Sequence, residues 1–256
     1  MKTEEKYMTE IGKFNKLRVI KKLDAGVYLD GKDLGEIFVP RDYAPEGCRT
    51  GDVADVFVFL DSEDKPIATT QRPSAMVGEF AFLKVVSVNP VGAFLDWGLQ
   101  KDLLVPFSEQ RQKMEEGKSY IVYIYLDDRT SRIVASSKLN KFLDKQPEEF
   151  QEGQSVELLI CDQTEMGYKA IISNSSQGVL YKNEVFQTLK KGQRLTGFIK
   201  KIREDGKIDL CLQKPGYEVI DDVSEKIMDK LKVRGGFLPA TDKSSTEIIY
   251  GLFGIS

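Results

Sequence analysis

The stretch from Pro90 to Phe107 reads PVGAFLDWGLQKDLLVPF and places Phe94, Trp97 and Phe107 close together. Aromatic rings at a protein surface can stack on the bases of a single-stranded nucleic acid, while nearby cations follow its phosphates. Rings in such a pattern can also fill the core of a folded domain. Which chemistry applies depends on the elements that carry these residues.

A second group of residues combines aromatic rings with positive charge later in the chain. Residues 182–214 contain nine Lys or Arg and four Asp or Glu, and two tyrosines precede them. This mixture is typical of sites for single-stranded nucleic acid. A solvated charged face is the alternative interpretation. The candidate binding residues here are Tyr168, Lys169, Tyr181, Lys182, Lys200, Arg203 and Lys207.

The composition argues against catalysis and against a metal site. The 256 residues include no histidine, which excludes a Ser-His-Asp or Cys-His pair and any imidazole ligand. The cysteines Cys48, Cys161 and Cys211 form no CxxC pair, and we expect them to be reduced and buried. We therefore expect no catalytic residue, no metal and no cofactor.

The net charge and the apolar runs bear on the kind of binding surface and on the location of the protein in the cell. A net charge of −3 does not suit a protein that binds nucleic acid over its whole surface, so a local patch is required. The N-terminus lacks a signal-peptide pattern, and no apolar run reaches the length of a membrane span. We expect a cytoplasmic protein with no membrane partner.

The glycines reveal an internal repeat. Three triplets of glycine share spacings of 14 and 25 residues, which indicates three copies of one unit. A fourth shared position lies 14 residues after the second glycine of each triplet and holds Pro, Pro and Tyr. The triplets are Gly12, Gly26 and Gly51; Gly78, Gly92 and Gly117; and Gly153, Gly167 and Gly192.

Each copy contains about five short segments rich in Val, Ile, Leu, Phe and Tyr, separated by turn residues. Five strands in so short a unit predict a small closed barrel of the OB type, because closure removes the exposed sheet edges. The repeated glycines are expected where a strand bends sharply or takes a positive φ. Two short helices are predicted after Lys214, within DDVSEKIMDKLK and STEIIYGLF.

The strand pattern places the aromatic residues of the opening stretch. Phe94 lies two residues after Gly92, in a strand expected to form the binding face, and Tyr28 has the same place in the first copy. We therefore predict that Phe94 and Tyr28 stack on bases, with core filling as the alternative. Alternation puts Trp97 on the opposite face, which favours packing between barrels. Phe107 is predicted to lie in the core.

Several stretches resemble known proteins. GAFLDWG and KDLLVPFSEQ resemble the RNA-binding barrel repeat of the largest small-subunit ribosomal protein, the S1 type. The whole chain is more similar still to the conserved virulence factor B (CvfB-like) family, in stretches such as GVYLDGKDLGEIFVP, VGEFAFLKVVSVNP and IREDGKIDLCLQ. That family implies three S1-type barrels followed by a winged-helix segment, RNA binding with regulatory consequences in bacteria, and no catalysis.

The chain departs from the S1 pattern at several positions. The aromatic residue of the family's GAF triplet is Tyr28 and Phe94 in the first two copies but Lys169 in the third. The late acid and base of the motif correspond to Asp61 with Lys65 and to Asp127 with Arg132. In the third copy these two positions hold Arg203 and Lys207.

The tail resembles only the first two helices of the family's winged helix. We therefore do not expect this chain to read the grooves of double-stranded DNA, which requires a third helix. The predicted architecture is mainly β, with three tandem five-stranded OB barrels and a truncated helical segment. Its boundaries are residues 8–72, 73–140, 151–214 and 217–256.

The predicted function is that of a non-enzymatic, single-stranded RNA-binding regulatory protein. Its contacts would be base stacking and phosphate binding, with modest sequence preference. The alternative is a protein-interaction adaptor whose barrels dock on a ribosome, polymerase or nuclease partner. The acidic total charge and the altered motif positions favour that alternative.

Overall fold

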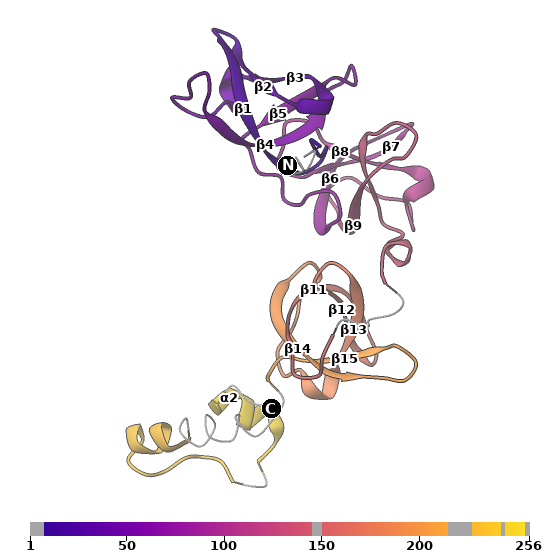
Figure 1. Ribbon diagram of the computed structural model, residues 1–256. Coiled ribbons are helices and arrows are strands. Elements are labelled where there is room, and N and C mark those ends of the chain that lie inside the picture. The colour runs from indigo at the N-terminus through magenta and orange to yellow at the C-terminus, as the bar shows by residue number, and fades with distance from the viewer. Residues whose placement is uncertain (1–7, 145–149, 215–226, 242–243, 254–256) are drawn as a thin grey trace. The chain divides into compact units, whose positions relative to one another are not determined.

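The computed structural model describes residues 8–144, 150–214, 227–241 and 244–253 (Figure 1). The chain divides into two compact units, Met1–Lys141 and Phe142–Ser256. Three closed five-stranded barrels account for nearly all of the regular structure, as the repeat predicts. Two of these barrels lie in the first unit, and the third lies in the second unit together with the helical tail.

The first barrel closes in the strand order β1-β2-β3-β5-β4. Its strands β3 and β5 pair in parallel, and its other neighbours pair antiparallel. Its strands are β1 (Phe14–Leu23), β2 (Gly26–Asp30), β3 (Glu36–Pro40), β4 (Val53–Leu60) and β5 (Pro66–Thr69).

The second and third barrels repeat this topology strand for strand. The second barrel contains β6 (Phe80–Asn89), β7 (Gly92–Asp96), β8 (Leu103–Pro106), β9 (Ser119–Leu126) and β10 (Ile133–Ser136). The third barrel contains β11 (Ser155–Thr164), β12 (Gly167–Ile172), β13 (Ser176–Tyr181), β14 (Arg194–Ile202) and β15 (Ile208–Cys211).

Short 3-10 turns connect several of the strands, and the tail contributes the helices. Residues 227–233 are helical, and the rest of the first predicted helix lies outside the described residues. The remaining elements are η1 (Lys32–Leu34), η2 (Arg41–Tyr43), η3 (Phe107–Glu109), η4 (Leu139–Lys141), η5 (Lys182–Glu184) and α2 (Thr246–Phe253).

The shared glycines have two structural roles. The first and third glycine of every triplet adopt a positive φ, between 78° and 99°, which a residue with a Cβ rarely adopts. The second glycine allows the next strand to approach. A Cβ at Gly26, Gly92 or Gly167 would lie 2.1, 2.3 or 2.0 Å from a carbonyl oxygen of that strand.

The second glycine also fixes the register of the hairpin that follows it. Gly26 pairs with Pro40, Gly92 with Pro106 and Gly167 with Tyr181, so the fourth shared position of the repeat is the cross-strand partner of this glycine. A register defined at one end of a hairpin determines which residues face each other along all of it. Equivalent residues therefore lie at equivalent places on the three barrels.

The first two barrels share part of a hydrophobic core. Phe57 of β4 is fully buried within the core cluster of the second barrel. Its ring contacts that of Trp97 edge-on, with 5.7 Å between the ring centroids. Trp97 is only 3% exposed, which confirms the prediction that it packs between barrels. Residues 8–141 therefore behave as one packed body with two barrels.

We predict that Gly92→Ala destabilises the second barrel more than Gly117→Ala does. The new Cβ at position 92 would collide with the Val105 carbonyl, whereas nothing lies within 4 Å of a Cβ at position 117. The expected loss in the free energy of unfolding is about 3 kcal/mol for Gly92→Ala. Gly117→Ala should cost about 1 kcal/mol, from its positive φ alone.

Urea unfolding followed by the emission of Trp97 measures both losses, because this single tryptophan belongs to the second barrel. An equal or larger loss for Gly117→Ala would contradict the steric role assigned to the second glycine.

Candidate nucleic-acid interface

The candidate interface is the face formed by the second, third and fifth strands of each barrel. In each barrel, three residues pair side by side in one row across this face. The row begins on the second strand, two positions after the second glycine, and continues through a residue of the third strand to a residue of the fifth strand. The three rows are Tyr28, Phe38 and Ile67; Phe94, Leu104 and Val134; and Lys169, Val179 and Asp209.

The first barrel presents two adjoining aromatic rings on this face. The half-buried rings of Tyr28 and Phe38 lie 5.1 Å apart, measured between centroids. The Lys21 ammonium lies 5.8 Å from the Tyr28 ring. Sequence reasoning missed Phe38, although its position two residues before Pro40 identifies it as the cross-strand partner of Tyr28. Two rings beside a cation suit a stacked base and its phosphate.

The second barrel has a pocket on the same face. The pocket has a volume of about 210 Å³, and the half-buried ring of Phe94 forms part of its wall together with Leu104 and Val134. Phe59 and Leu60, at the end of β4 in the first barrel, also line it. The face of the second barrel is therefore partly covered by its neighbour.

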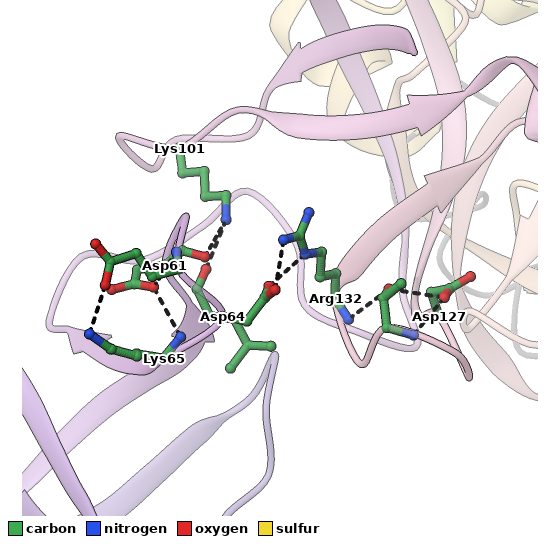
Figure 2. A network of polar contacts seen from close by, with 9 residues as sticks. Asp61, Asp64, Lys65, Lys101, Asp127 and Arg132 are labelled. Atoms are coloured by element: carbon green, nitrogen blue, oxygen red, sulfur yellow. Dashed lines mark hydrogen bonds and ion pairs between the residues drawn. The ribbon is translucent and has the colours of Figure 1, made fainter.

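Cations at this pocket also hold the two barrels together (Figure 2). The Lys101 ammonium donates hydrogen bonds to the backbone carbonyls of Leu60 and Asp61, both at 3.0 Å. The Arg132 guanidinium donates to both carboxylate oxygens of Asp64, at 2.6 and 2.8 Å. Figure 2 shows both side chains reaching toward the turn between β4 and β5 of the first barrel.

The charges in this network influence one another. The hydrogen bond from Arg132 lowers the pKa of the Asp64 carboxyl, and the same contact raises the pKa of Arg132. Burial lowers the pKa of the Lys101 ammonium, and the nearby charge of Arg132 adds to this effect. Burial raises the pKa of Asp102, another residue that lines the pocket, with help from Asp96.

The acid and base positions of the S1 hairpin lie opposite each other in every copy. Asp61 and Asp127 donate from their backbone amides to the carbonyls of Lys65 and Arg132, and Arg203 does so to Lys207. The predicted pairing of these positions in a hairpin is therefore confirmed at the backbone. The side chains of the acid and base positions form no ion pair with each other. Lys65 pairs with Glu63 instead, and Arg132 pairs with Asp64.

The third barrel carries a polar cluster on its face. Arg203 donates through Nε to Asp209 at 3.0 Å and through Nη2 to the Tyr181 hydroxyl. The hydrogen bond to Asp209 raises the pKa of Arg203. Tyr181 is half-buried, and its hydroxyl also lies 3.3 Å from Asp209. The structure thus brings together Tyr181 and Arg203, both predicted site residues.

The other predicted cations of the third barrel are exposed. Lys200 pairs with Glu184, and Lys207 pairs with Asp205 at 2.6 Å. Lys169 and Lys182 form no ion pair with any residue that the structure describes. Exposed pairs contribute only about 0–1 kcal/mol, so phosphate groups can compete for these cations.

Two expectations from the sequence need correction. Tyr168 is only 7% exposed and belongs to the core of the third barrel, because the residue directly after the second glycine points inward in every copy. Its ring is not accessible for stacking. Phe107 is 44% exposed at the start of η3 and is not a core residue. Among the cysteines, Cys48 and Cys161 are buried as expected, and Cys211 is half-buried.

Within the described ranges, no three His, Cys, Asp or Glu side chains gather as a metal site would require. None of the helices in the described part of the chain has the length and apolar character needed to span a bilayer.

Comparison with known proteins defines the class to which this architecture belongs. The model of the S1 domain matches residues 11–71 and again residues 77–138, which are the first two barrels. S1 domains are nucleic-acid-binding barrels of the OB type. The model of the CvfB-like winged helix domain matches residues 225–256. Neither of these matches indicates a catalytic domain.

The chain belongs to the CvfB-like family, in which S1 domains are combined with a CvfB winged-helix domain. It is 26% identical over 251 residues to the Bacillus subtilis (strain 168) protein named Uncharacterized protein YitL, covering 91% of this chain and 80% of that one. It is 24% identical to Conserved virulence factor B of Staphylococcus saprophyticus, covering 81% and 72%.

A solved structure is similar over most of the chain. It is described as a multidomain protein with nucleic acid binding domains from Streptococcus pneumoniae. The similarity covers 96% of this chain and 89% of that one, with 21% sequence identity and a TM-score of 0.45.

We predict that Arg132→Ala raises the titration midpoint of the Asp64 carboxyl toward its ordinary value. Because the pKa of Asp64 is lowered, the ion pair stabilises the contact fully at pH values above the ordinary pKa of 3.8. This stabilisation is lost as the pH falls through the lowered pKa. Carboxyl chemical shifts measured by NMR against pH report the midpoint.

Asp127 is the internal control for this titration. The side chain and amide of Thr130 lower the pKa of its carboxyl. Its midpoint should not change in Arg132→Ala, because Arg132 takes part in that hairpin through its backbone, which accepts from the Asp127 amide and donates to the Thr130 hydroxyl. An unchanged Asp64 midpoint in the variant would show that the pair does not form in solution.

Proposed function

We propose that this protein binds single-stranded RNA through the outer faces of its barrels and thereby regulates gene expression. Bases stack on Tyr28, Phe38 and Phe94, while phosphates contact neighbouring cations. The observation that carries the proposal is the half-buried ring of Phe94, which lines a pocket together with Lys101 and Arg132. A ring beside cations is the combination that single-stranded nucleic acids require.

The third barrel contributes charge more than stacking. Lys169 stands where the first two barrels have an aromatic residue, and Lys182, Lys200, Arg203 and Lys207 add cations nearby. Such a barrel contacts the phosphates of a strand, and the half-buried ring of Tyr181 stacks on one base at most. This division gives affinity with modest sequence preference.

Membership of the CvfB-like family supports a regulatory role in bacteria. Relatives in this family are named Conserved virulence factor B. We place the activity in the cytoplasm, where RNA is accessible, and assign no catalytic residue, metal or cofactor to it. Docking on a ribosome, polymerase or nuclease partner without RNA contact is the competing function, and the experiment below separates the two.

The test is the fluorescence anisotropy of labelled oligouridine and oligoadenosine, titrated with the protein at several salt concentrations. The expected result is binding that weakens with salt, at a log-log slope of about −0.7 per phosphate contact. Phe94→Ala should weaken binding by about 1–3 kcal/mol, the contribution of one stacked base.

Lys200→Ala combined with Arg203→Ala should instead reduce the salt slope. Val53→Ala is a suitable control, because this residue is 62% exposed on β4 of the first barrel and lines no part of the pocket. Absence of binding at low salt by the folded protein would contradict the proposal. Partners that co-purify after RNase treatment would then favour the adaptor.

A further inference from the structure

The pocket on the second barrel has walls from two barrels. Phe94, Leu104 and Val134 come from the face of the second barrel. Phe59 and Leu60 come from the end of β4 in the first barrel and line the same pocket. A single barrel would offer an open platform, whereas here the same ring borders a partly open pocket of about 210 Å³.

The wall from the first barrel is held firmly. Phe57, on the same strand, packs its ring against Trp97 and lies 6.2 Å from the ring of Phe59. Lys101 binds the carbonyl groups of Leu60 and Asp61, which are the last residues before the turn. The spacing between the two walls is therefore set by the packing of Phe57 before Leu60 and by the hydrogen bonds of Lys101 to Leu60 and Asp61.

The cations that hold this wall keep donors for a ligand. An ammonium has three donors and a guanidinium has five. Lys101 uses two of its donors on backbone carbonyls, and Arg132 uses only its Nε and one Nη2 hydrogen on Asp64. Each side chain can therefore bind an acceptor in the pocket without releasing the neighbouring barrel.

From this geometry we infer that the two barrels form a slot that holds one unstacked nucleobase between Phe94 and the Leu60 wall. The apolar walls accept the faces of the ring, and the donors of Lys101 and Arg132 meet carbonyl oxygens of the base or its adjoining phosphate. The base belongs either to an RNA strand or to a free nucleotide. The inference rests on the proposed function and adds that the first barrel is part of the binding site of the second.

Trp97 provides a direct readout of the slot. It is the only tryptophan of the chain, it lines the pocket, and its indole Nε1 donates to the Lys101 carbonyl at 2.6 Å. A base in the slot should change the emission of Trp97. RNA bound elsewhere should leave the emission as it is.

The experiment titrates the full chain with labelled oligouridine and records both the anisotropy of the label and the emission of Trp97. Uridine monophosphate and ribose 5-phosphate are titrated separately. The expected result is that the emission changes with the same midpoint as the anisotropy and that ribose 5-phosphate has no effect. A change with uridine monophosphate identifies a free nucleotide as a ligand, and a change with the oligomer alone identifies a base within a strand.

Leu60→Ala tests the wall, and Leu23→Ala is the matched control. Leu23 is an exposed leucine on β1 of the same barrel, and it does not line the pocket. Leu60→Ala should weaken the emission change by roughly threefold to tenfold, and Leu23→Ala should not alter it. The measurement on the unaltered protein remains decisive if Leu60→Ala does not fold.

Two results would overturn the inference. The first is a rise in anisotropy with constant Trp97 emission, which would mean that RNA binds outside the slot and would leave the proposed function intact. The second is an equal response to ribose 5-phosphate, which would mean that the pocket binds phosphate alone. Absence of both signals would contradict the proposed function itself.

Discussion

The close approach of two strands at the second glycine of each repeat is the constraint on which the rest of the structure depends. At Gly26, Gly92 and Gly167 a carbonyl oxygen of the next strand occupies the space of a Cβ. The contact fixes the hairpin register, and the register places the residue two positions later on the outer face of the barrel. The position of every candidate stacking residue follows from this one steric requirement.

One framework thus carries three different faces. In the first barrel the row begins with the aromatic residues Tyr28 and Phe38. In the second barrel the row is apolar around Phe94, and in the third it begins with Lys169 and ends at Asp209. The core beneath each row is conventional, since the residues after the second glycine, Val27, Ala93 and Tyr168, all point inward. Differences between the barrels therefore lie on the surface, where they can change binding without changing the fold.

Much of this could be predicted from the sequence, because the glycine spacing encodes the barrel. The barrel number, the face of Phe94 and Tyr28 and the packing role of Trp97 follow from spacing and alternation. The repeat also contains the signals that contradict the predictions for Tyr168 and Phe107. The equivalents of Tyr168 are small and apolar, and the residues equivalent to Phe107, Arg41 and Lys182, are charged residues that begin a 3-10 turn. The contacts of Arg132 with Asp64 and of Lys101 with the β4 end were not predictable, since they join two barrels and no repeat pattern encodes them.

The most direct test of the central claim is photo-crosslinking of 4-thiouridine-labelled RNA to the full chain, with the linked peptides identified by mass spectrometry. RNA binding through these faces predicts crosslinks in residues 26–40 and 92–106 and, more weakly, in residues 167–181, which are the hairpins whose register the second glycines fix. Crosslinks confined to other strands or to the helical tail would contradict it, because the glycine register would then position no part of the binding surface.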